Sequence, residues 1–558
     1  MDNFRLVLIF LLAMLGLFIY QAWLQDYPPQ PPVAPTAAVK EGGPSITGEP
    51  TAPAGVPDVS VTPNDAQLAT PLATAAALTG APSVTPITVE TDLIHLEISP
   101  IGGTISSLWL KDYLVNPKNT DDKLRLFKPQ PPNMFVSQSG LLGAEPDVLP
   151  THEATFTSTQ QQYSLNDGED QLVVELLWTS PAGIEVKKTY RFDRGSYVIT
   201  AGQEIVNASG AAVTAREYAQ LQRTELHDPN AASFVYTYTG GVYYTPEDKY
   251  KKESFDDMRS SKLERQVSDG WVAMIQHYFL ASWIPPRATE QTFYTNVLGD
   301  ARYIIGMYSP AVSIPTGAVH QFENRLFAGP KLHDTLAEVA PGLELTVDFG
   351  WLTIIAEPIY WLLSQIHSFV GNWGWSIIIL TILIKLAFYK LSETSYKSMA
   401  NMRKFTPRIQ ALKDRYGDDK QRLNQAMMEI YKKEKINPLG GCLPIVVQIP
   451  VFISLYWVLL ESVELRHAPF ALWLDNLTAP DPYFVLPAIM AISMFIQQKL
   501  NPAPPDPIQA KIMMSLPVVF GVFFAFFPSG LVLYWTVNNI LSIAQQGYIT
   551  RKIEQGGK

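Results

Sequence analysis

One lysine lies inside an apolar stretch of the sequence that is long enough to cross a bilayer. Lys385 occurs in WGWSIIILTILIKLAFYKL, which runs from Trp373 to Leu391. A charge at the middle of a membrane costs about 2.5–3.5 kcal/mol on insertion scales, so such a residue normally faces a protein interior or a water-filled cavity. Lys385 is therefore a functional-site candidate. The alternative is that it snorkels to the surface, because it lies about six residues, or roughly 9 Å, from the end of the segment.

The same segment and other apolar segments of the chain also carry polar or amphipathic groups. These candidates are Thr381, Gln448, Gln498, Tyr534 and Trp535. Thr381 lies four residues before Lys385 and shares its helix face. If these groups converge, they form a wet, positively charged pocket within the membrane, which lowers the cost of bringing a polar or acidic peptide segment there. The set holds no nucleophile–base pair, no metal ligands and no phosphate-binding glycine loop, so it does not predict catalysis or a cofactor.

The elements that must position these groups suggest a polytopic α-helical membrane protein of six spans with a large extracytoplasmic β-sandwich domain. The expected segments are an anchor (1–26), a Pro/Ala/Thr-rich disordered tether (27–86), the β-sandwich (87–350), an interfacial amphipathic helix (351–371), a second span (372–391), a cytoplasmic basic hairpin (392–439), a third span (440–463), an outside loop (464–482), a fourth span (483–500), a cytoplasmic loop (501–510), a fifth span (511–527), a sixth span (528–547) and a cytoplasmic tail (548–558). The first segment has the length of a span and no clear small-residue cleavage site, which favours an anchor over a cleaved signal peptide.

Charge is distributed unevenly along the chain and fixes the expected orientation. Residues 26–348 hold 38 acidic and 22 basic residues, a charge of −16, whereas residues 393–435 hold 6 acidic and 11 basic residues, a charge of +5. The positive-inside rule places the basic block and both termini in the cytoplasm and the acidic domain outside. Cys442 is the single cysteine, which excludes an intrachain disulfide framework. The eight histidines show no metal-binding spacing, so no metal site is expected.

The acidic domain is predicted from short runs of β-branched and aromatic residues that are separated by Gly, Pro, Asn and Asp, as in ITVETDLIHLEIS and QLVVELLWTS. Runs of this kind over residues 87–350 indicate one large β-sandwich. Glu185, Glu204 and Glu217 could be imagined as a glycosidase pair, but spacing alone cannot place two of them together. Strands commonly carry acids on their wet face, and we expect these three carboxylates to be solvated.

The basic segment 392–439 is predicted to form two antiparallel helices around a turn at Gly417. Its candidate contact residues are the methionines Met399, Met402, Met427 and Met428. Flexible, polarisable methionine side chains suit an adaptable binding surface, and the basic charge suits anionic lipid headgroups. The alternative is a solvated hairpin that merely follows the positive-inside rule.

Several long contiguous stretches resemble one protein family. They are SYKSMANMRKFTPRIQALKDRYGDDKQRL, KINPLGGCLPIVVQIPVFISLYW, VELRHAPFALW and FPSGLVLYW. They are similar to the YidC-type membrane protein insertases, the family that includes the mitochondrial Oxa and chloroplast Alb insertases. The likeness covers essentially the whole chain in the Gram-negative form of the family: an anchor, a periplasmic β-sandwich and a five-span core.

The resemblance implies an insertase and chaperone, not an enzyme, that acts on nascent integral proteins of the bacterial inner membrane, alone or with the Sec translocon and its accessory subunits. It also implies a hydrophilic groove whose charged residue is usually arginine and here is Lys385. The substitution keeps the charge but removes the planar guanidinium. Thr381, Gln498 and Trp535 match polar or aromatic groove positions less closely. The hairpin resembles the family's substrate-receiving element, the short basic tail suits ribosome contact, and membrane lipids are further partners. No cofactor and no nucleic-acid specificity is expected.

Two other classes of function stay open at this point. A secondary solute transporter would use Lys385 as an ion-coupling site, and it would show inverted repeats with broken helices in matching halves, a symmetry that the sequence lacks. A sugar-modifying enzyme would rest on the β-sandwich, which is an argument from fold analogy alone.

Overall fold

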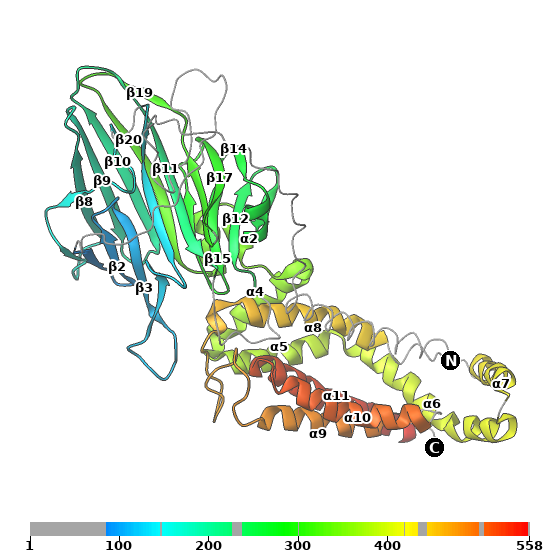
Figure 1. The fold of residues 1–558 in the computed structure, drawn as a ribbon. Helices are drawn as coiled ribbons and strands as arrows, with labels where there is room; N and C mark the ends of the chain where they lie inside the picture. The colour runs from blue at the N-terminus through cyan, green and yellow to red at the C-terminus, as the bar shows by residue number, and fades with distance from the viewer. Residues whose placement is uncertain are drawn as a thin grey trace, which may run out of the picture. The chain divides into compact units, whose positions relative to one another are not determined.

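The computed structural model describes residues 85–144, 148–225, 237–299, 301–417, 419–433, 443–501 and 507–555. They form a β-rich part followed by a run of helices (Figure 1). The predicted anchor, and the predicted tether as far as residue 84, lie outside these residues.

Residues 87–330 form two sheets that share one apolar core, so the prediction of a β-sandwich-like domain is confirmed (Figure 1). The first sheet has the order β14 (Glu264–Ser268), β17 (Glu290–Leu298), β18 (Arg302–Tyr308), β11 (Val213–Thr224), β5 (Phe135–Gly143), β3 (Thr104–Leu114), β2 (Ile94–Ser99), β1 (Ile87–Glu90) and β7 (Gln162–Ser164), with β19 (Val312–Ile314) beside β11 and β4 (Lys123–Phe127) beside β3. The second has the order β13 (Lys249–Glu253), β12 (Gly240–Thr245), β15 (Trp271–Gln276), β16 (Phe279–Ile284), β20 (Val319–Pro330), β10 (Val198–Asn207), β9 (Ile184–Asp193), β8 (Gln171–Thr179) and β6 (Thr157–Ser158). Two short helices accompany them, α2 (Phe255–Ser260) and α3 (His333–Val339).

Strand β9 shows how the sequence selects the buried face. Ile184, Val186, Lys188, Tyr190 and Phe192 are buried, while the residues that alternate with them are exposed or half-buried. Side chains alternate across a strand, so this period of two places one apolar row between the sheets. Lys188 occupies an inward position of the same row, and its ammonium donates to the carbonyls of Gly102 at 2.7 Å and Ser139 at 2.8 Å.

The three strand carboxylates do not share one environment. Glu204 lies partly exposed, 3.3 Å from the ammonium of Lys187. Glu217 is buried between the sheets, where its carboxylate accepts hydrogen bonds from Gln203 at 2.8 Å and Asn324 at 2.7 Å. The expectation that all three are solvated is therefore wrong for Glu217, because Glu217 lies on the inward face of β11, in register with the buried Ala215 and Ala219. Burial raises the pKa of Glu217 to about 7.

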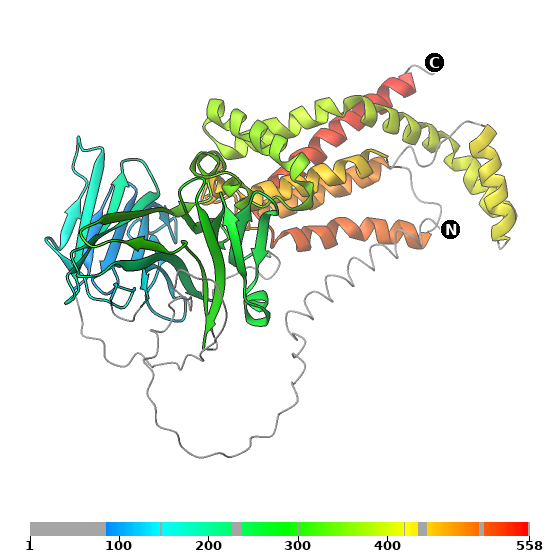
Figure 2. The same ribbon diagram turned by 90° about the horizontal axis from the view of Figure 1, so that it is seen from above.

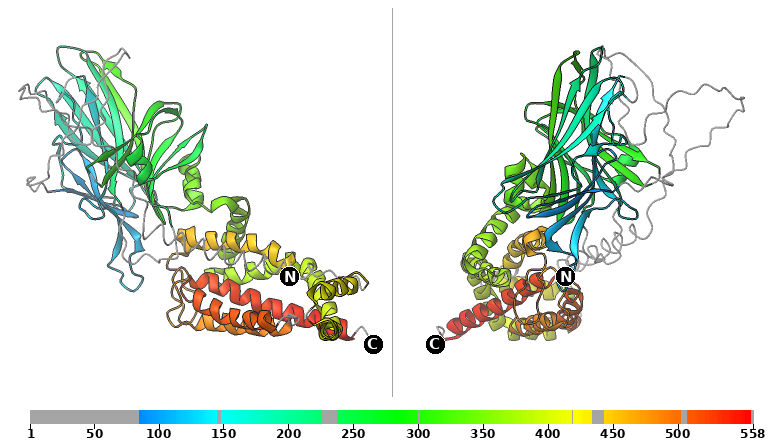
Figure 3. Two further views of the ribbon diagram at one scale, coloured as in Figure 1. Left: turned by 45° about the vertical axis from the view of Figure 1, so that its right-hand side comes forward. Right: turned by 90° about the vertical axis from the view of Figure 1, so that its left-hand side faces the viewer.

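Eight helices follow the β-rich part within the described residues: α4 (Thr353–Val370), α5 (Trp373–Ala387), α6 (Tyr389–Tyr416), α7 (Lys420–Lys433), α8 (Leu443–Glu461), α9 (Val485–Leu500), α10 (Pro507–Phe524) and α11 (Ser529–Gln555). Helix α11 contacts α5, α6, α8 and α9, and α4 packs on α5 and α8. Figures 2 and 3 show α9, α10 and α11 (orange to red) running side by side.

Two helix limits differ from the prediction. The predicted second span (372–391) is broken: α5 ends at Ala387 and α6 begins at Tyr389, with a bend of 66° between them. The sequence has neither proline nor glycine there, so the break lies where packing of α5 on α4 gives way to packing of α6 on α8. In addition, α11 continues to Gln555, so much of the predicted tail is helical.

The helices were tested for the length and hydropathy of a membrane span. Among the described residues no single helix meets both criteria, and the bent pair of α5 with Tyr389–Met399 meets them together.

Polar side chains fix where the helices begin. Asn372 caps α5, since its side-chain oxygen accepts from the backbone N–H of Trp375 at 3.1 Å while its amide donates to the carbonyl of Phe470 at 3.1 Å. At α9 the carboxylate of Asp481, three residues before the N-cap Phe484, accepts from the backbone N–H of Leu486 in the first turn at 2.7 Å. Satisfying these otherwise unpaired N–H groups sets the outer limits of both helices.

Two glycines of equal backbone conformation test how tightly the sandwich is packed. Gly102 and Gly195 both have φ of +71°, but a Cβ at Gly102 would lie 2.1 Å from the carbonyl oxygen of His152, whereas nothing lies within 4 Å at Gly195. Left-handed strain alone costs alanine about 1–2 kcal/mol. We expect Gly195→Ala to lower the free energy of unfolding by about that amount, and Gly102→Ala to lower it by about 3 kcal/mol or more. Thermal unfolding of the full chain, followed by tryptophan fluorescence, measures both, and equal losses would contradict the packing argument.

Candidate functional site

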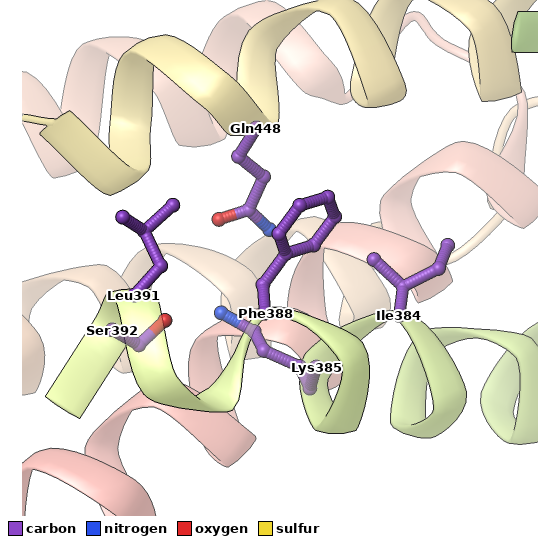
Figure 4. A pocket seen from close by; sticks show the side chains of 6 residues that line it. All are labelled: Ile384, Lys385, Phe388, Leu391, Ser392 and Gln448. Carbon is purple, nitrogen blue, oxygen red and sulfur yellow. The ribbon is translucent and has the colours of Figure 1, made fainter.

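A small pocket lies at the elbow between α5 and α6. It is lined by Ile384, Lys385, Phe388, Leu391, Ser392 and Gln448. Figure 4 shows Lys385 from the last turn of α5 and Gln448 from α8 extending into the same space. The volume open to water is about 10 Å³, roughly the room that one water molecule needs. In this conformation the pocket admits water but no stretch of polypeptide.

The ammonium of Lys385 does not stand alone in this pocket. It donates a hydrogen bond of 2.8 Å to the hydroxyl oxygen of Ser542 on α11. Its position in the last turn of α5 also places it near the helix C-terminus, where the macrodipole favours a cation. Lys385 is half-buried, and its ammonium has a hydrogen-bond partner within the protein.

Gln448 is held in the same manner from the opposite side. Its side-chain N–H group donates to the side-chain oxygen of Asn538 on α11 at 2.5 Å. This bond uses one of the two N–H groups of Gln448, whose carboxamide oxygen is an acceptor. The pocket thus combines a cationic donor from α5 with an amide from α8, and both are anchored to α11.

The other predicted groove residues do not line the pocket, although the side chain of Tyr534 interacts with Gln448. Thr381 is buried, and its hydroxyl donates to the carbonyl of Ile377 in its own helix at 2.6 Å. Gln498 is half-buried in the last turn of α9 and is not among the pocket residues. Tyr534 is 1% exposed and stacks on Phe452. Trp535 packs edge-on against Phe452 at 4.6 Å. Of the predicted set, the structure brings Lys385 and Gln448 together in the pocket, and Thr381, Gln498 and Trp535 do not join them.

The hairpin methionines are distributed over α6 and α7. Met399 and Met427 are half-buried and Met428 is 54% exposed. The side chain of Met402 lies outside the described part of the helix. The methionines with described side chains thus include one large exposed apolar group, on a helix with basic neighbours.

The sequence argument missed Asn538 and Ser542. Both follow Tyr534 at intervals of four residues, so Tyr534, Asn538 and Ser542 form one row along α11. A polar row at this spacing in an apolar helix is visible in the sequence and indicates a face that meets other polar groups. Asn539, beside this row, donates to the hydroxyl of Ser493 on α9 at 3.2 Å.

Helix α8 carries Gln448 near its beginning, and the β-rich part holds its C-terminal end. His277, in the turn between β15 and β16, lies 2.9 Å from the carbonyl oxygen of Leu460 through its Nε2 atom. The Lys331 ammonium lies 3.3 Å from the carboxylate of Glu461 and donates to the carbonyl of Thr346. The side chains of Lys331 and Glu461 are 3% and 8% exposed. His277 thus contacts a carbonyl group that the helix end leaves unpaired, and the Lys331 ammonium adds a cation there, which the helix dipole favours.

Comparison with known proteins agrees with the division of the chain into a β-rich part and a helical part. Residues 86–362 match the YidC periplasmic domain, and residues 365–556 match the 60Kd inner membrane protein family. The membrane protein insertase YidC of Methylococcus capsulatus is 52% identical over 556 residues, with 100% of this chain and 99% of that protein covered. The insertase YidC of Nitrosococcus oceani is 49% identical over 562 residues, with both chains fully covered. A crystal structure of an active YidC insertase aligns with a TM-score of 0.39 at 17% identity, over 83% of this chain and 92% of that one.

The protein is thus an integral protein of the bacterial inner membrane with a periplasmic domain. The chain belongs to the YidC family of membrane protein insertases. The resemblance drawn from the core motifs is confirmed, and the family is one of insertases rather than enzymes.

The contact at the end of α8 predicts a pH dependence. Burial lowers the pKa of His277 to about 3, and the Lys331 ammonium adds to this effect. In the unfolded chain the imidazole has a pKa of about 6.5, so the unfolded state binds a proton as the pH falls while the folded state does not. Stability present above pH 6.5 is therefore lost as the pH falls towards 3. Between pH 7.5 and pH 5 we expect the folded chain to lose about 2 kcal/mol through this group.

His277→Gln keeps a hydrogen-bond donor but does not titrate, so it is the matched variant. Thermal unfolding of both proteins at pH 7.5 and pH 5 isolates the contribution of His277, since the other titrating groups are the same. A pH dependence that is unchanged in His277→Gln would show that His277 is not buried as a neutral group.

Proposed function

We propose that this insertase receives a segment of a nascent membrane protein at the α5–α6 elbow, in a polar groove whose charge is Lys385. The observation that supports it most directly is that a half-buried ammonium and the amide of Gln448 line the same water-sized pocket between apolar helices. A cation and an amide are the groups that a polar or acidic peptide segment needs when it leaves water.

The groove acts by lowering a barrier, without bond making. Each unsatisfied polar group in hydrocarbon costs several kcal/mol, and hydration and charge attraction at Lys385 offset part of that cost for the short outside segment of the client. The apolar segment then enters lipid, where burial at about 25 cal/mol per Å² drives release without nucleotide. Since the pocket holds about one water molecule, the elbow at Phe388 opens when a client enters.

The membrane arrangement proposed here has six spans: the N-terminal anchor, the bent pair α5–α6, and α8, α9, α10 and α11. Large apolar side chains are exposed on these helices and on α4, as at Trp361, Phe369 and Trp375. Aromatic residues of this kind concentrate at membrane interfaces. Lys385 lies ten residues, or roughly 15 Å, beyond Trp375 along α5, which is about half the thickness of a hydrocarbon core. Both termini lie in the cytoplasm.

The proposed partners follow from the surfaces. Nascent membrane proteins meet the groove and the hairpin of α6 and α7, where Met428 is exposed. The basic hairpin contacts anionic lipid headgroups. The cationic end of α11, with Arg551 and Lys552 exposed, contacts the ribosome. The Sec translocon and its accessory subunits cooperate with the insertase for larger clients.

A solute transporter is less well supported. That mechanism needs discontinuous helices in both halves of a repeat. Among the described helices, α5–α6 is the bent pair found at membrane-spanning length, and no second pair matches it.

The charge at residue 385 is the first test. We expect Lys385→Arg to retain insertion, because the charge is kept. Lys385→Ala should insert a small single-span client with an acidic outside tail about tenfold more slowly, and Lys385→Glu more slowly still, because charge attraction is lost or reversed. Protease protection of the client in cells depleted of the native insertase measures the rate. A fully active Lys385→Glu protein would rule out the groove mechanism.

The route of the client is the second test. We expect photocrosslinking probes at Gln448 and Phe388 to react with a nascent single-span protein, because both line the pocket. Thr381 is buried, and its hydroxyl is bonded within its own helix. A probe at this residue serves as the matched control and should react weakly. Crosslinks that form from the hairpin or the β-rich part, with none from Gln448 or Phe388, would place the client on another route.

A further inference from the structure

Helix α11 presents two hydrogen-bond acceptors in one row, and each holds one polar group of the pocket. Ser542 accepts from Lys385, and Asn538 accepts from Gln448. We propose that Ser542 and Asn538 are positioning residues of the insertase, which fix the distance and direction between the groove cation and the groove amide. This inference rests on the proposed role of Lys385 in receiving the client.

The hydrogen bonds of Ser542 fix the direction of its hydroxyl group. The O–H group donates to the backbone carbonyl of Asn538 at 2.7 Å, one turn earlier in α11. Since the proton is used within the helix, the oxygen lone pairs point outward, and one of them accepts from the Lys385 ammonium. The hydroxyl of Tyr396, on α6, also interacts with Ser542. The serine thus joins α5 and α6 across the break between them.

Holding the ammonium at one of its three N–H groups leaves two for water and for a client. A lysine chain has four rotatable bonds, and fixing its end in advance removes an entropy cost that would otherwise oppose each binding event. The serine is neutral, so it restrains the charge without cancelling it. An aspartate or glutamate at residue 542 would pair with Lys385 and neutralise it.

Asn538 performs the corresponding task for Gln448. An amide can present its oxygen or its N–H groups to a client, and the bond to Asn538 uses one of the two N–H groups and so fixes the direction of the oxygen. The pocket therefore presents N–H donors with positive charge from α5 and an oxygen acceptor from α8. That pair complements an extended acidic peptide, whose carboxylate accepts from the ammonium while a backbone N–H donates to the amide oxygen.

The inference predicts selectivity for clients with acidic outside tails. Hydrogen bonds to charged groups contribute more than neutral ones, so loss of orientation at Lys385 should affect acidic tails more than neutral tails. A serine that merely packs α11 against α5 would affect both clients alike.

The test measures insertion of two single-span clients that differ in tail charge, by full-length variants of this chain. We expect Ser542→Ala to slow the acidic client about fivefold and the neutral client little. Ser542→Thr keeps the hydroxyl and should restore the rate. Thr536→Val is the matched control, because Thr536 makes the same intrahelical bond, to Val532 at 2.8 Å, on the same helix. Its rates should equal those of the unmodified chain.

The decisive comparison uses the Lys385→Ala background. If Ser542 acts through the ammonium, Ser542→Ala causes no further loss when Lys385 is already alanine. An equal further loss in that background, or equal slowing of both clients, would overturn the inference and leave the groove proposal intact. A Lys385→Ala chain as active as the unmodified one would overturn both.

Ser542→Cys covers the case in which Ser542→Ala fails to fold. The thiol has a similar size and is a weak acceptor, so it should slow the acidic client while the unfolding temperature stays unchanged. Normal insertion of the acidic client by a folded Ser542→Cys chain would count against the inference.

Discussion

The helical core depends on compensating one ammonium group among apolar helices. An unpaired charge in such surroundings is costly, and removing one partner of a buried pair leaves the other uncompensated. The chain solves this with a neutral hydroxyl from Ser542 and the C-terminal dipole of α5, rather than with a carboxylate. A carboxylate would bind Lys385 more strongly but would cancel the charge that the proposed groove uses. The weaker partner keeps the charge stable and still available.

This constraint explains the central place of α11. Its polar side chains reach α5 through Ser542, α8 through Asn538 and α9 through Asn539. Helices in lipid gain no hydrophobic driving force from contact with one another, so interhelical hydrogen bonds and close packing must set their arrangement. Near Trp535 the same helix changes to aromatic contacts with Phe452 and Phe524. One part of α11 thus contributes polar groups to the pocket, and the part near Trp535 packs against aromatic side chains.

The sequence predicts what depends on local pattern and composition. Alternation in strands such as β9 indicates the sandwich, and the charge inside an apolar run indicates Lys385. It fails where distant residues decide. The sequence near Phe388 has no proline or glycine that would predict the helix break, because packing against other helices produces the break. Glu217 reads as an ordinary strand carboxylate, since its partners Gln203 and Asn324 come from other strands. The row containing Asn538 and Ser542 is visible in the sequence, but its meaning depends on which helices it faces.

Helix α11 continues well past the pocket. Its 27 residues give a length of roughly 40 Å, which exceeds a hydrocarbon core of about 30 Å. Ser542 lies near the middle, and the exposed cations Arg551 and Lys552 lie two to three turns further along. A helix is stiff along its axis, so these last turns move together with Ser542, which accepts a hydrogen bond from Lys385. In the proposed arrangement, a partner bound at Arg551 and Lys552 is therefore coupled mechanically to the position of the Lys385 ammonium.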